Sequence, residues 1–150
     1  MTRPIIVFAV IALLLLFHNY WNRSWSVRAF IPLALVGSCA VLSTLGKSYF
    51  DRVRPGAGLT TLLDLEPSYP SSHTVFIAAA GCSFLFFARR HRLLILVTVG
   101  LATCFMGVVR LTVGVHWFTD IVGSAFLSFG MWLIFYVIDD WLAEKERNSL

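Results

Sequence analysis

Charged residues are scarce in this sequence, and their scarcity excludes most soluble proteins. Asp, Glu, Lys and Arg together make up 13% of the 150 residues, whereas a soluble domain carries about 25%. Hydrophobic residues make up 58% and the mean hydropathy is +0.79, which excludes a disordered chain more firmly still. The length is that of one domain. It leaves room for about five membrane-spanning helices of roughly 20 residues each, and for no separate soluble domain.

Cysteine is also sparse, and its distribution excludes the usual thiolate metal sites. Cys39, Cys82 and Cys104 lie singly inside apolar runs, at spacings that suit no metal ion, so we expect them to be packing residues. The sequence has neither a carboxylate cluster for magnesium nor a Cys/His set for zinc. We therefore expect no metal and no cofactor.

Five apolar runs predict an all-α fold: an integral membrane helical bundle of about five transmembrane helices, in a single domain over residues 1–150. The first run, Ile5–Phe17, has the features of a signal peptide, but no small-residue cleavage site follows it, so we expect a retained helix. The polar stretch Lys47–Ser72 predicts a loop with a short interfacial helix near residues 62–65. The charged tail from Asp139 is expected to fray in water. The other four runs are Ala29–Gly46, Thr74–Ala88, Leu93–Val109 and Ile121–Ile138.

The basic residues predict the orientation of these helices. With five spans, the N-terminus and the loops Lys47–Ser72 and Arg110–Asp120 share one side of the membrane. Because cytoplasmic loops collect Lys and Arg, the other side, which has more of them, is expected to face inward. We therefore expect a cytoplasmic (inner) membrane protein whose Lys47–Ser72 side faces the periplasm or outside. The inner-side residues are Arg23, Arg28, Arg89, Arg90, Arg92, Lys145 and Arg147; the outer-side residues are Arg3, Lys47, Arg52, Arg54 and Arg110.

The net charge of +4 has two interpretations. A basic excess can indicate nucleic acid or anionic lipid as a partner. In so apolar a chain, positive loops more often reflect topology. We therefore expect membrane lipids and no nucleic acid as partners, and no oligomeric state is predicted.

Several polar residues on the outward side have ordinary explanations when taken singly. Lys47 and Arg54 can extend their charges from a helix end to water, and His73 can be a polar residue near a helix start. Asp120 is harder to explain, because an acid in an apolar context is costly unless it is paired. His116 precedes it by four residues, so on a helix the two would share a face. A carboxylate there can orient the imidazole and set its tautomer.

Three cations and two serines complete a candidate phosphate site. Lys47, Arg54 and Arg110 supply positive charge, and an arginine fork matches the geometry of phosphate oxygens. Ser71 and Ser72 add hydroxyl and backbone N–H donors at a helix start, where the helix dipole favours an anion. The pattern indicates metal-free phosphoryl transfer, with an imidazole nucleophile, a second histidine as the acid and a cationic cage for the transition state.

Three segments resemble the motifs of the type 2 phosphatidic acid phosphatase superfamily. Residues 47–55 are Lys-Ser-Tyr-Phe-Asp-Arg-Val-Arg-Pro, which resembles a first motif of lysine, six residues and Arg-Pro. Residues 70–73, Pro-Ser-Ser-His, are similar to the second motif, Pro-Ser-Gly-His. Residues 110–120 have the spacing of the third, Ser-Arg-x5-His-x3-Asp. The likeness extends over residues 46–142, the motif-bearing core, and includes bacterial phosphatases of phosphatidylglycerophosphate and undecaprenyl pyrophosphate.

The resemblance implies a core like that of acid phosphatases and vanadium haloperoxidases, and a role for each matching residue. His116 would attack phosphorus and form a phosphohistidine, while Asp120 would hold the correct tautomer. His73 would protonate the leaving oxygen and then activate the hydrolytic water. The residues that would bind the phosphate oxygens are Lys47, Arg54, Arg110, Ser71 and Ser72.

The implied activity is that of a membrane lipid phosphatase, acting without metal on a lipid phosphate or pyrophosphate. Candidate substrates are phosphatidylglycerol phosphate, phosphatidic acid and undecaprenyl pyrophosphate. Two alternatives remain open: a lipid phosphotransferase with an alcohol acceptor, and a non-catalytic membrane transport or scaffold protein. The apolar spans argue against a soluble vanadate-dependent haloperoxidase of the wider superfamily.

The sequence departs from the family pattern in three ways. Ser72 stands where the family usually has glycine, and Val109 stands where the third motif usually has serine. Neither change removes a charged or catalytic group, so we expect activity to survive. The family's membrane enzymes typically have six spans, whereas five are expected here, and the missing span would be N-terminal.

Overall fold

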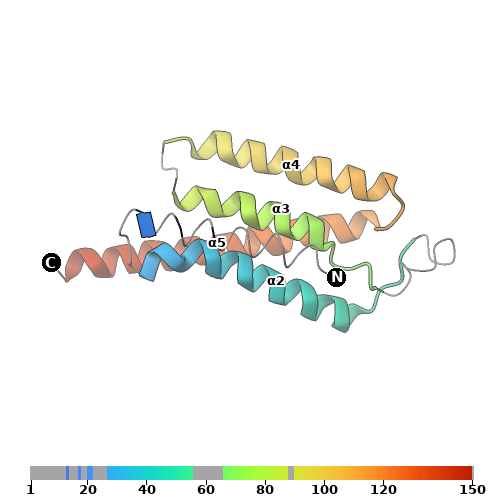
Figure 1. Ribbon diagram of the computed structural model, residues 1–150, viewed down its shortest axis with the longest axis horizontal. Helices are drawn as coiled ribbons and strands as arrows, with labels where there is room; N and C mark the ends of the chain where they lie inside the picture. The colour runs from blue at the N-terminus through green and yellow to red at the C-terminus, as the bar shows by residue number, and fades with distance from the viewer. Residues whose placement is uncertain are drawn as a thin grey trace.

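The structure is a computed structural model, shown in Figure 1. It describes residues 27–55, 66–87 and 90–149, together with Leu13, Phe17, Tyr20 and Trp21. The first predicted span, Ile5–Phe17, therefore lies outside the described residues except for Leu13 and Phe17. The interfacial helix predicted near residues 62–65 lies outside them entirely.

The described residues form helices and no strands, which confirms the predicted all-α fold. The long helix α2 follows directly on a short 3-10 helix, and Pro32 occupies its first turn, where a missing N–H costs nothing. The elements in chain order are η1 (Val27–Phe30), α2 (Ile31–Phe50), α3 (Ser72–Ser83), η2 (Phe84–Phe86), α4 (Arg92–Thr112) and α5 (Phe118–Asn148).

Three described segments are long and apolar enough to cross a membrane: Val27–Phe50, Arg92–Thr112 and Phe118–Asn148. They correspond to the second, fourth and fifth apolar runs of the sequence. The third run forms Ser72–Phe86, which is apolar but shorter than these three. The described part of the chain thus has three candidate spans by length and composition, where the whole sequence predicts about five.

The C-terminal tail differs from its prediction. Fraying was expected from Asp139 onward, yet α5 continues as regular helix to Asn148. The tail is rich in residues that favour helix, and Arg28 holds it by an ion pair of 2.8 Å to Asp139, with Glu146 at 3.6 Å. The prediction was wrong because it treated these charges as solvated rather than paired across the bundle.

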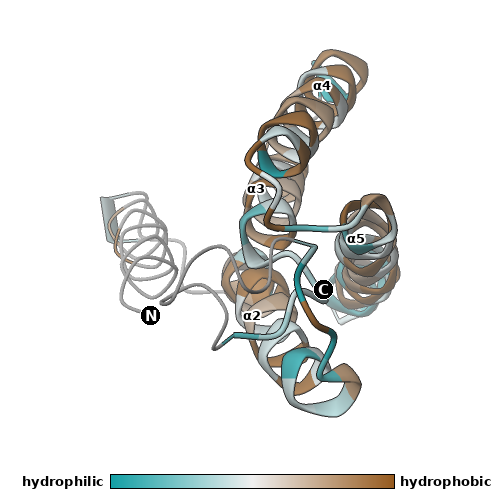
Figure 2. Ribbon diagram, turned by 90° about the vertical axis from the view of Figure 1, so that its right-hand side faces the viewer, coloured by the Kyte–Doolittle hydropathy of each residue, from teal (hydrophilic) through white to brown (hydrophobic). Residues whose placement is uncertain are grey.

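Helix α3 is the centre of the bundle. It packs against α2, α4 and α5, whereas α4 and α5 contact each other far less. The end-on view shows α3 between α4 and α2, with α5 alongside (Figure 2). The outer surface of α4 is apolar, as suits contact with lipid tails. Its exposed large side chains are Leu93, Leu94, Val97, Leu101, Phe105 and Val108.

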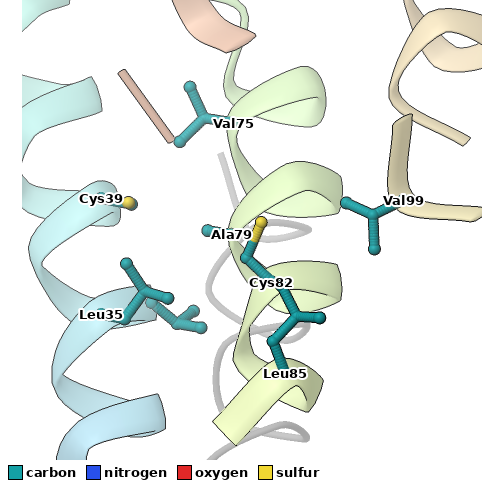
Figure 3. Close-up of a cluster of buried hydrophobic side chains, with 8 residues drawn as sticks. Leu35, Cys39, Val75, Ala79, Cys82, Leu85 and Val99 are labelled. Carbon is teal, nitrogen blue, oxygen red and sulfur yellow. The ribbon is translucent and has the colours of Figure 1, made fainter. Parts of the chain in front are cut away.

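The hydrophobic core joins α2, α3 and α4 along this central helix (Figure 3). Two of the three cysteines, Cys39 and Cys82, are fully buried in it, which confirms their prediction as packing residues. Cys104 instead lies exposed on α4. The buried members of the core are Leu35, Val36, Cys39, Val75, Ala79, Cys82, Leu85 and Val99.

Candidate active site

The three motif segments meet at one end of the bundle, on the right in Figure 1. Helix α2 ends there at Phe50 and α3 begins there at Ser72. Helix α4 ends at the same level at Thr112, and α5 begins after a five-residue connection. The fold therefore gathers residues that are up to 73 positions apart in the sequence, from Lys47 to Asp120.

The two basic residues of the first motif point into the protein rather than out to water. Lys47 Nζ donates a 2.7 Å hydrogen bond to the carbonyl of Pro67. Arg54 is only 9% exposed, and it donates to the carbonyls of Glu66 (2.9 Å) and Val115 (3.0 Å). The second of these bonds ties the first motif to the connection that carries His116. Extension of a charged side chain from a helix end to water, the ordinary explanation for Lys47 and Arg54, therefore does not account for these positions.

Arg110 and His116 carry buried nitrogens that have no hydrogen-bond partner among the described residues. These atoms are Arg110 Nε and His116 Nδ1; the only other such side-chain atom in the described chain is Trp132 Nε1. Buried polar groups are normally paired, and exceptions concentrate where a protein binds or reacts with something. Two of the three exceptions therefore lie at the predicted site.

Asp120 is close to His116, but its hydrogen bonds go elsewhere. His116 Nδ1 lies 3.6 Å from Asp120 Oδ2, which is longer than a hydrogen bond. Oδ2 accepts a 2.9 Å bond from the backbone N–H of Trp117, and Oδ1 accepts a 2.7 Å bond from Arg52. The side chain of Asp120 is fully buried. The carboxylate therefore caps α5 and pairs with an arginine.

The shared helix face predicted for His116 and Asp120 is not what brings them together. Helix α5 begins at Phe118, so His116 lies in the connection before it. Gly114 allows the chain to turn there, with φ of +72°, a conformation that favours glycine. The backbone N–H of Asp120 donates to the carbonyl of Trp117 at 3.0 Å, and this turn places the two side chains near each other.

The environment of His116 favours a neutral imidazole. Burial is the main cause that lowers the pKa of His116 from 6.5 to about 4. The positive charges of Arg54 and Arg110 act in the same direction, and the carboxylate of Asp120 opposes them. At neutral pH the ring therefore keeps a free lone pair, as a nucleophile requires.

The second motif is fastened to α5 through Ser124. The backbone N–H of Ser71 donates to Ser124 Oγ at 2.8 Å, and Ser124 Oγ donates to the carbonyl of Asp120 at 2.6 Å. Tyr69 also packs directly against Gly123, where an added Cβ would meet its ring at 2.6 Å. These contacts fix the start of α3 beside the third motif.

The three polar side chains of the second motif, those of Ser71, Ser72 and His73, differ from one another in burial and in their neighbours. Ser71 is buried and its hydroxyl accepts from Thr74 at 3.1 Å. The hydroxyl of Ser72 lies 3.3 Å from that of Ser43 on α2, so the side chain that replaces the family's glycine packs toward α2. His73 lies exposed in the first turn of α3.

Two residues of this candidate site, Arg52 and Ser124, were not predicted from the sequence. Arg52 was counted only as a topological charge, yet it forms the ion pair with Asp120. A buried carboxylate needs a cation or several hydrogen-bond donors. That requirement was a signal that Asp120 has a cationic partner, and Arg52 lies on the same side of the predicted bundle. Ser124 follows Asp120 by four residues, so helix periodicity alone places it on the same face.

The rim of the site is aromatic and exposed. Tyr49 and Phe50 lie at the end of α2, Phe118 begins α5 and Trp117 precedes it. The exposed fractions of these four residues range from 44% to 83%. The Trp117 indole also donates a 2.8 Å hydrogen bond to the carbonyl of Val53. Aromatic side chains of this kind gather where a membrane meets water.

The fold matches a solved membrane enzyme. The crystal structure of the first transmembrane PAP2 type phosphatidylglycerolphosphate phosphatase from Bacillus subtilis superposes with a TM-score of 0.67, over 93% of this chain and 68% of that one, at 22% identity. This likeness and the apolar helices show an integral membrane protein of that fold.

A characterised relative has a similar sequence. Phosphatidylglycerophosphatase B of Bacillus subtilis (strain 168) is 26% identical over an alignment of 125 residues, and the match covers 79% of this chain and 59% of that protein. The chain thus spans less than two thirds of the relative's length.

The family itself is shown by a match over most of the chain. The model of the PAP2 superfamily matches residues 28–144, a range that contains all three motifs. The chain belongs to the PAP2 superfamily.

Proposed function

We propose that this protein is a membrane lipid phosphatase, which removes a terminal phosphate from a lipid phosphate or pyrophosphate. The observation that carries the proposal is His116: a buried imidazole with a depressed pKa, near Arg54, Arg110 and Lys47. A neutral nucleophile beside fixed positive charges suits attack on an anionic phosphorus centre.

In the proposed reaction the histidine is phosphorylated and then hydrolysed. Nδ1 of His116 faces Asp120, so Nε2 attacks phosphorus. The Nε2–P bond forms as the bond from phosphorus to the lipid oxygen breaks, and His73 gives that oxygen a proton. A water molecule, deprotonated by His73, then attacks phosphorus and breaks the P–N bond. This step releases phosphate and restores both histidines.

The other motif residues hold the reacting group. Lys47, Arg54 and Arg110 stabilise the negative charge on the transferring oxygens. Ser71 and the backbone N–H groups near Ser72 assist at the start of α3, where the helix dipole favours an anion. Among the described residues there is no group of three His, Cys, Asp or Glu side chains that could hold a metal ion.

Phosphatidylglycerol phosphate is the substrate to test first, because the matched relative is a phosphatidylglycerophosphatase. Undecaprenyl pyrophosphate and phosphatidic acid share the terminal phosphate and the lipid tails. The aromatic rim formed by Tyr49, Phe50, Trp117 and Phe118 suits any of these amphiphiles. Comparing kcat/KM across the three lipids distinguishes a specific enzyme from a tolerant one.

The central experiment is phosphate release from the full chain in detergent with EDTA present. Wild-type protein should release phosphate, and His116→Ala should lose activity by a factor of at least 1,000, roughly the scale for a lost nucleophile. His91→Ala is the matched control, because His91 is exposed and precedes α4 at the opposite end of the bundle. Wild-type rates from His116→Ala would refute the proposal. A phosphorylated alcohol in place of free phosphate would indicate a phosphotransferase.

We further propose that the protein lies in the cytoplasmic membrane with this site facing outward. A cysteine replacing the exposed Val53, in a Cys104→Ser background, should react with a membrane-impermeant maleimide added to intact cells. A cysteine replacing Arg147, at the other end of the bundle, should react only after permeabilisation. The reverse pattern would reverse the orientation.

A further inference from the structure

We propose that Arg52 is a positioning residue, which holds the carboxylate of Asp120 in place for its action on His116. The inference rests on the function proposed above. It adds a residue that the three motifs leave unassigned, since position 52 is one of the six unspecified positions between Lys47 and Arg54.

The contacts of Arg52 fasten it at both its backbone and its side chain. The carbonyl of Arg52 accepts a 2.7 Å hydrogen bond from the backbone N–H of Ser68. Its Nη1 donates to Asp120 Oδ1 at 2.7 Å and to Thr119 Oγ1 at 2.6 Å. The guanidinium carbon lies 5.6 Å from the centre of the Trp117 ring, within the range of a cation–π contact. One arginine thus connects the loop after α2 to the first turn of α5.

Asp120 depends on this connection because nothing else among the described residues supplies it with a charged hydrogen-bond donor. Its side chain is fully buried, and its other oxygen accepts only from the backbone N–H of Trp117 and faces Nδ1 of His116 at 3.6 Å. A buried carboxylate that loses its ion-pair partner is strongly disfavoured. Without Arg52 the side chain would turn away from its present position, and its support for His116 would be lost.

Arg52 is suited to positioning rather than to holding the transferring phosphate. Its side chain is 39% exposed, whereas that of Asp120 is completely buried, so the arginine approaches the carboxylate from the outer rim. The side-chain contacts of Arg52 lie on Thr119, Asp120 and Trp117. We therefore expect its loss to lower kcat and to leave substrate binding nearly unchanged.

The first test is a split between kcat and KM. Arg52→Gln should lower kcat by about 10- to 100-fold, the loss typical when a residue that orients a functional side chain is removed, with KM within about threefold of wild type. Arg52→Lys should recover part of kcat, because lysine keeps the charge but not the planar fork. Arg147→Gln is the matched control, since this arginine is exposed near the far end of α5, and it should behave as wild type.

The second test is a double-mutant cycle. If Arg52 acts through Asp120, Arg52→Gln should change the residual kcat of an Asp120→Asn variant by less than about threefold. If Arg52 instead contacts the substrate directly, Arg52→Gln should raise KM, and it should lower kcat in the Asp120→Asn variant as much as in wild type. Either result would overturn the inference. If Arg52→Gln does not elute from size exclusion as a single species, the cycle is run with Arg52→Lys. An undiminished loss there would also overturn the inference.

The outcomes separate this inference from the function on which it rests. Activity that survives His116→Ala refutes the proposed function. A wild-type kcat for Arg52→Gln, together with an inactive His116→Ala variant, refutes only the role of Arg52.

Discussion

Nδ1 of His116 and Oδ2 of Asp120 lie 3.6 Å apart, both in side chains that are nearly or fully buried. The pair is therefore close enough to interact electrostatically but not to form a hydrogen bond. Asp120 meanwhile accepts bonds from Arg52 and from the start of α5. A shift of roughly 0.7 Å would bring the two atoms to the usual length of an N–H···O hydrogen bond, and catalytic hydrogen bonds often shorten when the substrate binds.

The first prediction concerns Asp120 itself. Asp120→Asn should lower kcat on a lipid phosphate by about 100- to 10,000-fold, because an amide neither selects the productive tautomer nor stabilises the cation that forms on His116. Asp140→Asn, on an exposed part of α5, should leave kcat unchanged. Steady-state phosphate release measures both variants, and an Asp120→Asn variant within threefold of wild type would contradict the proposed role.

The second prediction concerns the titration of His116. NMR of protein labelled at histidine should show this ring titrating near pH 4, where an ordinary histidine titrates near 6.5. Arg110→Gln should move the midpoint upward, because it removes a positive charge that opposes protonation. A wild-type midpoint between 6 and 7 would rule out the neutral, desolvated imidazole on which the proposed reaction depends.

The same pKa shift predicts a pH dependence of stability. The unfolded chain would protonate His116 near pH 6.5, whereas the folded protein resists protonation until about pH 4. The unfolded state therefore binds more protons between these values, and stability should fall as the pH drops from about 6.5 toward 4. The midpoint of thermal unfolding should therefore fall more over this pH window for wild type than for His116→Asn. Equal falls of the two midpoints would contradict the shifted pKa of His116.

The third prediction concerns the hydroxyl that fastens the second motif to the third. Ser124→Ala would leave the buried N–H of Ser71 without its partner, at a cost of about 1–3 kcal/mol. The midpoint of thermal unfolding should therefore fall, and phosphate release should fall with it. Thr98→Ala is the control, because its exposed hydroxyl bonds only to the carbonyl of Leu94 in the same helix. Equal unfolding midpoints for the two variants would count against the role of Ser124.

The fourth prediction compares two glycines of α5. A Cβ at Gly123 would meet the Tyr69 ring at 2.6 Å, whereas a Cβ at Gly130 meets nothing within 4 Å. Tyr69 is also in edge contact with Phe50, with ring centres 4.8 Å apart, so it has little freedom to withdraw. Gly123→Ala should therefore destabilise the fold by about 1–3 kcal/mol, while Gly130→Ala should be neutral or mildly stabilising. Matching unfolding midpoints would contradict the close packing.

Much of the fold followed from patterns that are local in the chain. Apolar runs separated by charges predicted the positions of α2, α3, α4 and α5, because burying an apolar helix in lipid needs only a long enough apolar segment. The ends were harder to predict. Asp139 was expected to begin a frayed tail, and the partner that keeps it helical, Arg28, is 111 residues earlier in the sequence.

The sequence by itself determined which charged residues and histidines are candidates for the site, because motif spacing reflects which residues the proposed chemistry needs. The tertiary structure alone decided how they are paired. Arg54 bonds to the connection before His116, and Asp120 bonds to Arg52 rather than to the histidine four residues before it. The physical reason is desolvation: a buried charge takes the best donor that packing brings within reach. Which donor that is depends on how α2 and α5 meet, and no local pattern specifies it.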